Sequence, residues 1–263
     1  MTLAWAFIRR DWLRLASYRL LVIWQALGLT VFIAAIYFAA GFVATAVGMA
    51  THSSDYVQFV LAGIAFTDVY LTGLKAFPNA LRDAQLAGTL EPMLLAPIRL
   101  PQLVAASSVF VFVQSLFRLS IVVTLAVTVF GYWHQANLLT AVLVLIPGCL
   151  TFAAVGLVSA ACVVLFKQGD PIAGAYGFVS SMLGGTVVPV SVLPGWMHPL
   201  SQFVPLTHAL NGTRLAMSGA SPLKALTSIA ALWAMTLVLL PIALAVFSAA
   251  LRRAKKEGTL VQY

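Results

Sequence analysis

Six long apolar runs, separated by shorter polar or basic segments, dominate this chain of 263 residues. A helix needs about 20 predominantly apolar residues to cross the hydrocarbon core of a bilayer, and every run is long enough. The chain is 62% hydrophobic and only 8% charged, whereas a soluble protein carries roughly a quarter charged residues. We therefore predict an all-α integral membrane protein with a single transmembrane domain over residues 1–263. Its six predicted transmembrane helices are Leu20–Val47, Val57–Leu81, Leu103–Phe130, Leu138–Phe166, Ile172–Val192 and Ala225–Leu251.

The positions of lysine and arginine predict how the chain is oriented in the membrane. Basic residues accumulate on the cytoplasmic side, and most of them share that side here if the N-terminus is cytoplasmic. Arg214 and Lys224 fall outside, while Lys75 and Arg118 lie within spans. We expect a multi-pass protein of the cytoplasmic (inner) membrane, with both termini inside and residues 252–263 as a cytoplasmic tail. The same bias accounts for the +8 net charge without a nucleic-acid partner.

Two segments outside the spans are too apolar to be ordinary loops. Residues 1–19 mix aromatic and aliphatic side chains with arginines, which is typical of an amphipathic helix in the headgroup region. An ordinary basic flank of the first span is the alternative. Residues 193–224 contain four prolines and are too short for two full spans. They predict a re-entrant outer hairpin of two short helices, whose irregular backbone must be buried in protein or line a wet cavity.

Polar side chains inside the second and third spans form a predicted intramembrane network. An ionised group in the hydrocarbon core costs several kcal/mol unless it is paired or wet. Helical spacing places these residues on one face of each span, and Asp68 and Arg118 reach similar depths, so we predict an ion pair between them. Two roles remain open for this pair, namely holding the two helices together and taking a direct part in handling substrate. The two sets are Asp68, Thr72, Lys75 and Asn79, and Ser107, Gln114 and Arg118.

The chain carries none of the motifs expected of an enzyme. No GxxxxGK[ST] occurs, so we expect no ATP site on this chain. The four histidines lack the spacing of a metal site, and no nucleophile elbow or triad pattern is present. Cys149 and Cys162 lie on one predicted helix, about 20 Å apart along its axis and beyond disulfide reach. We therefore predict no catalytic residue and no metal ligand.

The segment from Arg82 to Pro101, RDAQLAGTLEPMLLAPIRLP, is much longer than a turn between two spans requires. Its charged residues surround a leucine-rich centre, which favours an amphipathic helix along the cytoplasmic surface. We expect Pro97 and Pro101 to end that helix before the third span.

Three stretches resemble parts of one known family. GTLEPMLLAPI at Gly88–Ile98 is similar to the GTLE-x-LL-x-P signature of permease subunits of the type-2 ABC export family (ABC-2 type transporters). LPGWMHPLSQFVPL at Leu193–Leu206 and PLTHALNGTRLAMSG at Pro205–Gly219 resemble the segments that precede the last span in that family. The resemblance covers essentially the whole chain, and the order and spacing of the motifs agree with it.

The resemblance implies a transport subunit that works with other chains. A separate cytoplasmic ABC ATPase, in two copies, would bind ATP and Mg, and would push on the segment 82–101 as a coupling helix. A second permease protomer, identical or paralogous, and membrane lipid are the other implied partners. The implied ATPase-coupling residues are Gly88, Thr89, Leu90, Glu91, Met93, Leu94, Leu95 and Pro97. The implied residues of an outer gate are Pro194, Trp196, Pro205, His208 and Arg214.

The substrate and the mechanism leave alternatives open. Members of the family export polysaccharides, lipid-linked glycans, lipids or drugs. The aromatic residues here are scattered rather than aligned for stacking on sugars, which favours a lipid or an amphipathic drug-like substrate over a glycan. A different class of protein, an ion- or proton-coupled secondary transporter, would use Asp68, Lys75 and Arg118 as its relay. A membrane enzyme acting on lipids would need its histidines clustered at one interface.

Overall fold

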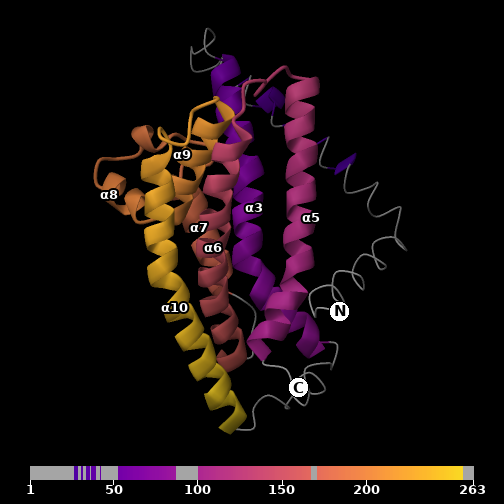
Figure 1. Cartoon of the computed structure of the whole chain (residues 1–263), viewed down its shortest axis with the longest axis vertical. Helices are drawn as coiled ribbons and strands as arrows, with labels where there is room; N and C mark the ends of the chain where they lie inside the picture. The colour runs from indigo at the N-terminus through magenta and orange to yellow at the C-terminus, as the bar shows by residue number, and fades with distance from the viewer. Residues whose placement is uncertain are drawn as a thin grey trace.

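The structure is a computed structural model that describes residues 27–28, 31, 34–35, 37–39, 42, 53–86, 100–166 and 171–256. Four of its helices are long and apolar enough to cross a membrane, and Figure 1 shows them running along the long axis of the molecule. These four are α3 (Ser53–Leu86), α5 (Leu100–Thr128), α6 (Leu138–Phe166) and α10 (Leu226–Lys256). Shorter elements connect α6 to α10, namely α7 (Pro171–Leu183), the 3₁₀ turn η2 (Val190–Val192), α8 (Met197–Gln202) and α9 (Pro205–Met217).

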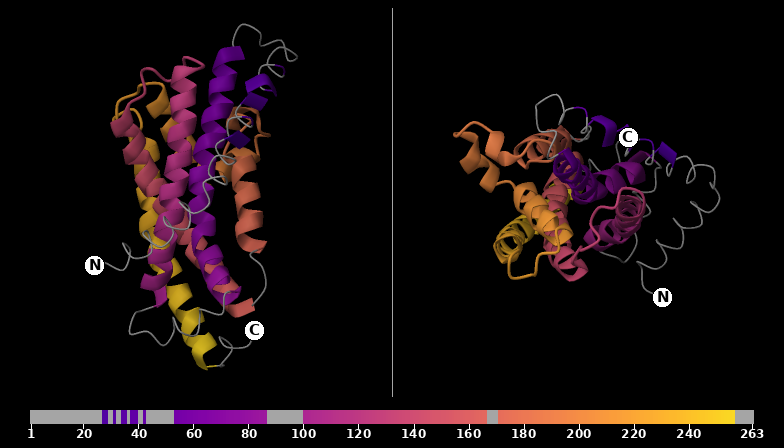
Figure 2. Two further views of the ribbon diagram at one scale, coloured as in Figure 1. Left: turned by 90° about the vertical axis from the view of Figure 1, so that its right-hand side faces the viewer. Right: turned by 90° about the horizontal axis from the view of Figure 1, so that it is seen from above.

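Helix α3 occupies the centre of the bundle. It packs against α5, α6, α7 and α9, while α6 also packs against α10, so that α6 separates α10 from α3 (Figures 1 and 2). Tyr70, Phe66 and Leu74 of α3 are fully buried, and the Tyr70 ring stacks on Phe152 of α6 with centroids 5.7 Å apart. The largest apolar core therefore surrounds α3.

Glycines and threonines bring the helices close together. At Gly156 of α6, an added Cβ would lie 2.5 Å from the carbonyl oxygen of Leu74 and 2.7 Å from that of Gly73. Small residues allow this backbone-to-backbone approach between membrane helices. On the other side of α6, the hydroxyls of Thr151 and Thr236 lie 2.7 Å apart and join α6 to α10.

Four of the predicted spans correspond to these long helices. Helix α6 begins and ends where the sequence predicts, and the Asn137 side chain accepts a hydrogen bond from the Thr140 amide at its start (3.1 Å), as a helix cap does. Helix α3 extends beyond the predicted limit of Leu81 to Leu86. The first predicted span, residues 20–47, and the interfacial segment 1–19 lie mostly or wholly outside the described residues. Of the predicted tail 252–263, residues up to Lys256 continue α10.

The predicted fifth span is too long. Helix α7 ends at Leu183 rather than Val192, and its 13 residues extend about 20 Å, less than the roughly 30 Å thickness of a hydrocarbon core. Gly185 terminates it with a positive φ of 77°, which glycine adopts without strain. The chain then turns through η2 and α8 before α9 begins. Two short helices are present within residues 193–224, as predicted, whereas their depth in the bilayer remains a prediction.

The predicted surface helix over residues 82–101 also differs from the structure at both ends. Its first five residues, 82–86, continue α3, and its last two open α5. Pro101 is the second residue of α5, where the missing amide proton of proline costs nothing, so Pro101 does not end a helix. The intervening residues 87–99 are outside the described part of the chain.

Candidate functional site

The exposed residues of α3 between Val57 and Leu81 are Asp68, Lys75 and Asn79. All other positions in that stretch are buried or half-buried, and α3 is the most enclosed of the four long helices. We refer to these three residues as the α3 polar strip. Helix α6 shows the opposite pattern, since every α6 residue described as exposed is Val, Leu or Ile. The uncovered face of the central helix is therefore polar, while that of its neighbour is suited to lipid.

The predicted ion pair between Asp68 and Arg118 is confirmed. The Nη2 and Nε atoms of Arg118 donate to Oδ2 of Asp68 at 3.0 and 3.1 Å and join α3 to α5. The two side chains keep 33% (Arg118) and 53% (Asp68) of their surface exposed. An exposed pair of this kind contributes at most about 1 kcal/mol in water, so stability alone is a weak reason for its presence.

The other predicted members of the polar network are placed differently from one another. Lys75 and Asn79 are exposed on the strip, and Arg82 continues it beyond the span. Thr72 is buried instead, and its hydroxyl donates to the carbonyl of Asp68 at 2.8 Å. A short threonine side chain can satisfy itself on its own helix backbone in this way, which removes it from the strip. Gln114 is half-buried, one turn before Arg118 on α5.

Arg214, predicted to lie in an outer gate, reaches into the bundle from α9. Its Nη2 atom donates to the carbonyls of Gly185 (2.8 Å), Thr186 (3.2 Å) and Phe59 (3.3 Å). Its guanidinium carbon also lies 3.5 Å from the centroid of the Phe59 ring, a cation–π contact. Helix α7 ends at Leu183, and Arg214 donates to two backbone carbonyls just beyond that end, so it joins the segment after α7 to α9 and α3.

The hairpin meets α3 closely at the same point. Gly63 lies against the carbonyl of Thr186 and the guanidinium of Arg214, so that any side chain there would collide with both. The hydroxyl of Thr186 lies 3.2 Å from that of Thr67, one turn further along α3. The segment after α7 is therefore held against α3 by contacts to both backbone and side chains.

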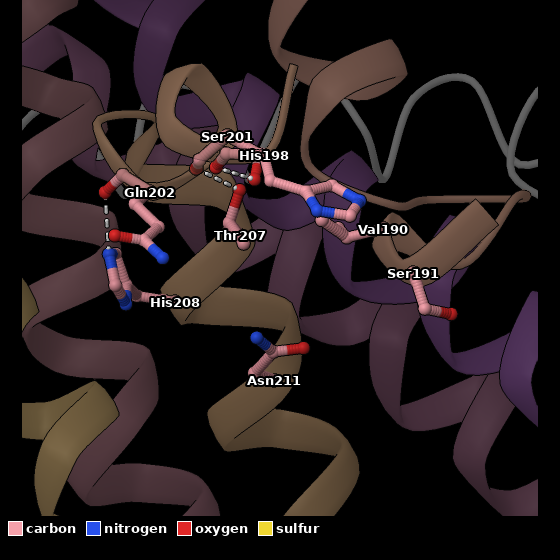
Figure 3. A pocket seen from close by; sticks show the side chains of 8 residues that line it. All are labelled: Val190, Ser191, His198, Ser201, Gln202, Thr207, His208 and Asn211. Carbon is pink, nitrogen blue, oxygen red and sulfur yellow. Dashed lines mark hydrogen bonds between the residues drawn. The ribbon is translucent and has the colours of Figure 1, made fainter. Parts of the chain in front are cut away.

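The remaining predicted gate residues lie away from Arg214. Pro194 and Trp196 are exposed between η2 and α8, and Pro205 is the buried first residue of α9. His208 lines a pocket between α8 and α9, in which its Nε2 donates to the carbonyl of Gln202 at 2.8 Å (Figure 3). Ser191, Gln202 and Asn211 also line this pocket, and none of them was predicted as a site residue from the sequence. The sequence signal that could have identified them is their polar character within an otherwise apolar hairpin.

The predicted ATPase-coupling residues, from Gly88 to Pro97, lie outside the described part of the chain. Within the part that is described, no group of three or more His, Cys, Asp or Glu side chains could hold a metal ion. The two cysteines on α6, Cys149 and Cys162, form no disulfide in the described part of the chain.

Long apolar helices packed around a central helix with a polar exposed face define a polytopic α-helical membrane protein. A sequence profile described as ABC-2 type transporter matches residues 2–218, and the chain belongs to this family. It is therefore a membrane subunit of an ABC transporter, with a role in transport rather than catalysis. No curated protein matches the chain.

Proposed function

We propose that this chain forms the translocation path of an ABC exporter for a lipid, a glycan or an amphipathic drug-like molecule. Two copies of a separate ATPase, which bind ATP and Mg, would drive it, and a second permease protomer, identical or paralogous, would complete the path. In this proposal the chain crosses the cytoplasmic membrane six times, with α7 and the segment that follows it together forming the fifth crossing, and both termini lie in the cytoplasm. The α3 polar strip is the observation that carries the proposal.

The strip supports a wet path because its exposure would be costly in lipid. A charged side chain facing the hydrocarbon core costs several kcal/mol, yet Asp68 and Lys75 are exposed on a helix that is otherwise enclosed. Water, or the matching face of a second protomer with water between them, removes that cost. A path bounded by the strips of two protomers follows from this argument.

The connection between α3 and α5 suggests how an ATPase would act on the path. The coupling residues lie between the end of α3 at Leu86 and the start of α5 at Leu100. A force on this segment acts on both helices, and the Asp68–Arg118 pair joins the same two helices within the bundle. Movement at the cytoplasmic surface would therefore change the geometry beside the strip.

Water at the strip is testable by cysteine accessibility. In a background with Cys149 and Cys162 replaced by serine, we expect Lys75→Cys and Asn79→Cys to react with a membrane-impermeant maleimide in inverted and right-side-out vesicles. The matched controls are Ile146→Cys and Leu143→Cys on the apolar face of α6. The strip positions should react about tenfold faster or more, because a thiol in an apolar environment does not ionise. Equal, slow labelling at all four positions would contradict a wet path.

ATP coupling is testable at Glu91, in the segment that resembles the family signature. We expect Glu91→Ala to insert normally into the membrane but to abolish transport-coupled ATP hydrolysis by the co-expressed ATPase. Removing the carboxylate deletes a charge that a basic groove on the ATPase would bind. Glu257→Ala, in the C-terminal tail, is the control for losing one glutamate. Full transport by Glu91→Ala would contradict this role, and transport that persists without ATP would favour the secondary-transporter alternative.

A further inference from the structure

A pocket in the outer hairpin, lined mainly by polar side chains, lies between α8, α9 and η2. It has a volume of about 410 Å³, within the range of sites that bind small molecules. Helix α8 contributes His198, Ser201 and Gln202, helix α9 contributes His208 and Asn211, and η2 contributes Ser191. Figure 3 shows the His198 ring reaching from α8 toward Val190, with the Gln202 and His208 side chains next to each other.

Some of the polar groups that line the pocket are hydrogen-bonded to one another or to the backbone around the pocket. The Ser201 hydroxyl donates to the carbonyl of His198 (2.8 Å), and the Thr207 hydroxyl donates to the carbonyl of Ser201 (2.6 Å). The Nε2 proton of His208 is bound by the carbonyl of Gln202, so its Nδ1 is an acceptor in the neutral ring. The bonds of Thr207 and His208 connect α9 to α8, the bond of Ser201 lies within α8, and together they give the pocket a defined shape.

The remaining capacity is available to a ligand. The Nε2 atom of His198 is buried and has no hydrogen-bond partner among the described residues, which is costly for a polar atom unless something else binds it. Gln202, Asn211 and Ser191 are exposed at the pocket. Side-chain amides and hydroxyls both donate and accept hydrogen bonds. The pocket thus offers donors and acceptors in a mixed arrangement.

The lining also lacks charge. Among the described residues that line the pocket, none is Asp, Glu, Lys or Arg. A phosphate or carboxylate is normally bound through arginine or lysine, and a cationic group through carboxylates or an aromatic cage. Hydroxyl groups, which donate and accept at the same atom, match this lining better than either ion does.

An apolar surface borders the same short helix. Trp196 and Phe203, which flank α8 at its two ends, are 69% and 80% exposed, and Leu200 within α8 is 48% exposed. Aromatic residues with this exposure are typical of the membrane interface, where they contact acyl chains beside the headgroups. A molecule bound in the pocket would therefore have lipid-like surroundings at the edge of its binding site.

We propose that the pocket binds the uncharged, hydroxyl-rich headgroup of an amphiphile, such as a sugar headgroup, with the acyl chain lying against Trp196, Leu200 and Phe203. This binding site stands on the pocket alone. That the bound molecule is also the transported substrate rests on the proposed function. In that case the substrates are amphiphiles with neutral, polyhydroxylated headgroups. Binding at the outer hairpin would place such a molecule beside the segment that Arg214 holds against α3.

The test uses the full chain in phosphatidylcholine nanodiscs without any ATPase, so that its outcome is independent of ATP coupling. The probe is an alkyl glucoside with a photoreactive diazirine in its chain, and adducts are mapped by mass spectrometry. We expect adducts within residues 190–211 that octyl glucoside displaces. Octyl phosphate and free glucose should each compete about tenfold less well, because one lacks the hydroxyls and the other lacks the chain.

Substitutions in the pocket test whether its own side chains bind the probe. Combining Gln202→Leu with Asn211→Leu removes two exposed amides and should reduce labelling of 190–211 at least fivefold, as expected from the loss of two hydrogen bonds. Gln135→Leu, an exposed amide in the loop between α5 and α6, is the matched control and should label as the parent does. Labelling that survives the double variant, or that octyl phosphate competes equally well, would overturn the proposal. Equal competition by glucose would overturn its lipid part.

Discussion

Replacing Gly156 with valine is expected to prevent the chain from assembling this bundle. A Cβ at Gly156 would lie 2.5 Å from the carbonyl oxygen of Leu74 and 2.7 Å from that of Gly73, and both are backbone atoms of the central helix. Neither can rotate away, so α3 and α6 would have to separate along their shared interface. Overpacking commonly costs 1–3 kcal/mol, and we expect at least about 3 kcal/mol here because backbone must move.

The measurement is the yield of monodisperse protein after extraction, followed by thermal unfolding of whatever is recovered. Gly174→Ala is the matched control, because an added Cβ at that position in α7 meets nothing within 4 Å. That control should behave as the parent does or unfold slightly higher, since alanine favours helix more than glycine does. A Gly156→Val protein with the parent's yield and unfolding temperature would show that α3 and α6 do not approach as closely as the structure has them.

Replacing Arg214 with methionine should detach the outer hairpin from α3. Methionine keeps the length and apolar stem of the side chain but cannot donate to the carbonyls of Phe59, Gly185 and Thr186. The carbonyl of Phe59 retains its helix bond, whereas those after α7 lose a charged donor. A buried acceptor left without its partner costs about 1–3 kcal/mol, so we expect a loss of about 2–4 kcal/mol. The corresponding fall in unfolding temperature is roughly 5–10 °C for a chain of this size.

Two further variants separate the geometry of Arg214 from its charge. Arg214→Lys keeps the charge but replaces the planar fork with a point donor, and should restore only part of the lost stability. Arg252→Met removes an exposed arginine near the end of α10 and should leave the unfolding temperature within about 1–2 °C of the parent, as surface changes usually do. Hydrogen exchange in residues 184–204 should rise in Arg214→Met. Unchanged exchange there would contradict the attachment.

The elements predicted best from the sequence are those whose signal is local. Helix α6 has the predicted bounds because a continuous apolar run begins directly after a capping residue, Asn137. The Asp68–Arg118 pair was predictable because two antiparallel spans place residues at equal depth, where an unpaired charge is costly. In both cases the information lies within one or two helices and does not depend on how the rest of the chain folds.

The predictions that differed from the structure depended on the whole bundle. Residues 184–192 are as apolar as a span, so hydropathy extends the fifth span across them, although two glycines and the close approach to Gly63 end α7 at Leu183. Thr72 has the spacing of the polar stripe but bonds to its own helix. Arg214 was assigned to the outer side by topology, and only the early end of α7 explains why it points inward.

Composition and periodicity were sufficient to establish an all-helical membrane protein and the polar face of its second predicted span, because both follow from the cost of placing polar groups in hydrocarbon. Which polar residues stay uncovered was decided by packing, since α5, α6, α7 and α9 pack around α3 and leave Asp68, Lys75 and Asn79 as its exposed residues between Val57 and Leu81. The hairpin pocket arose in the same way. Its residues are scattered over residues 190–211, and they meet only because α8 folds back against α9.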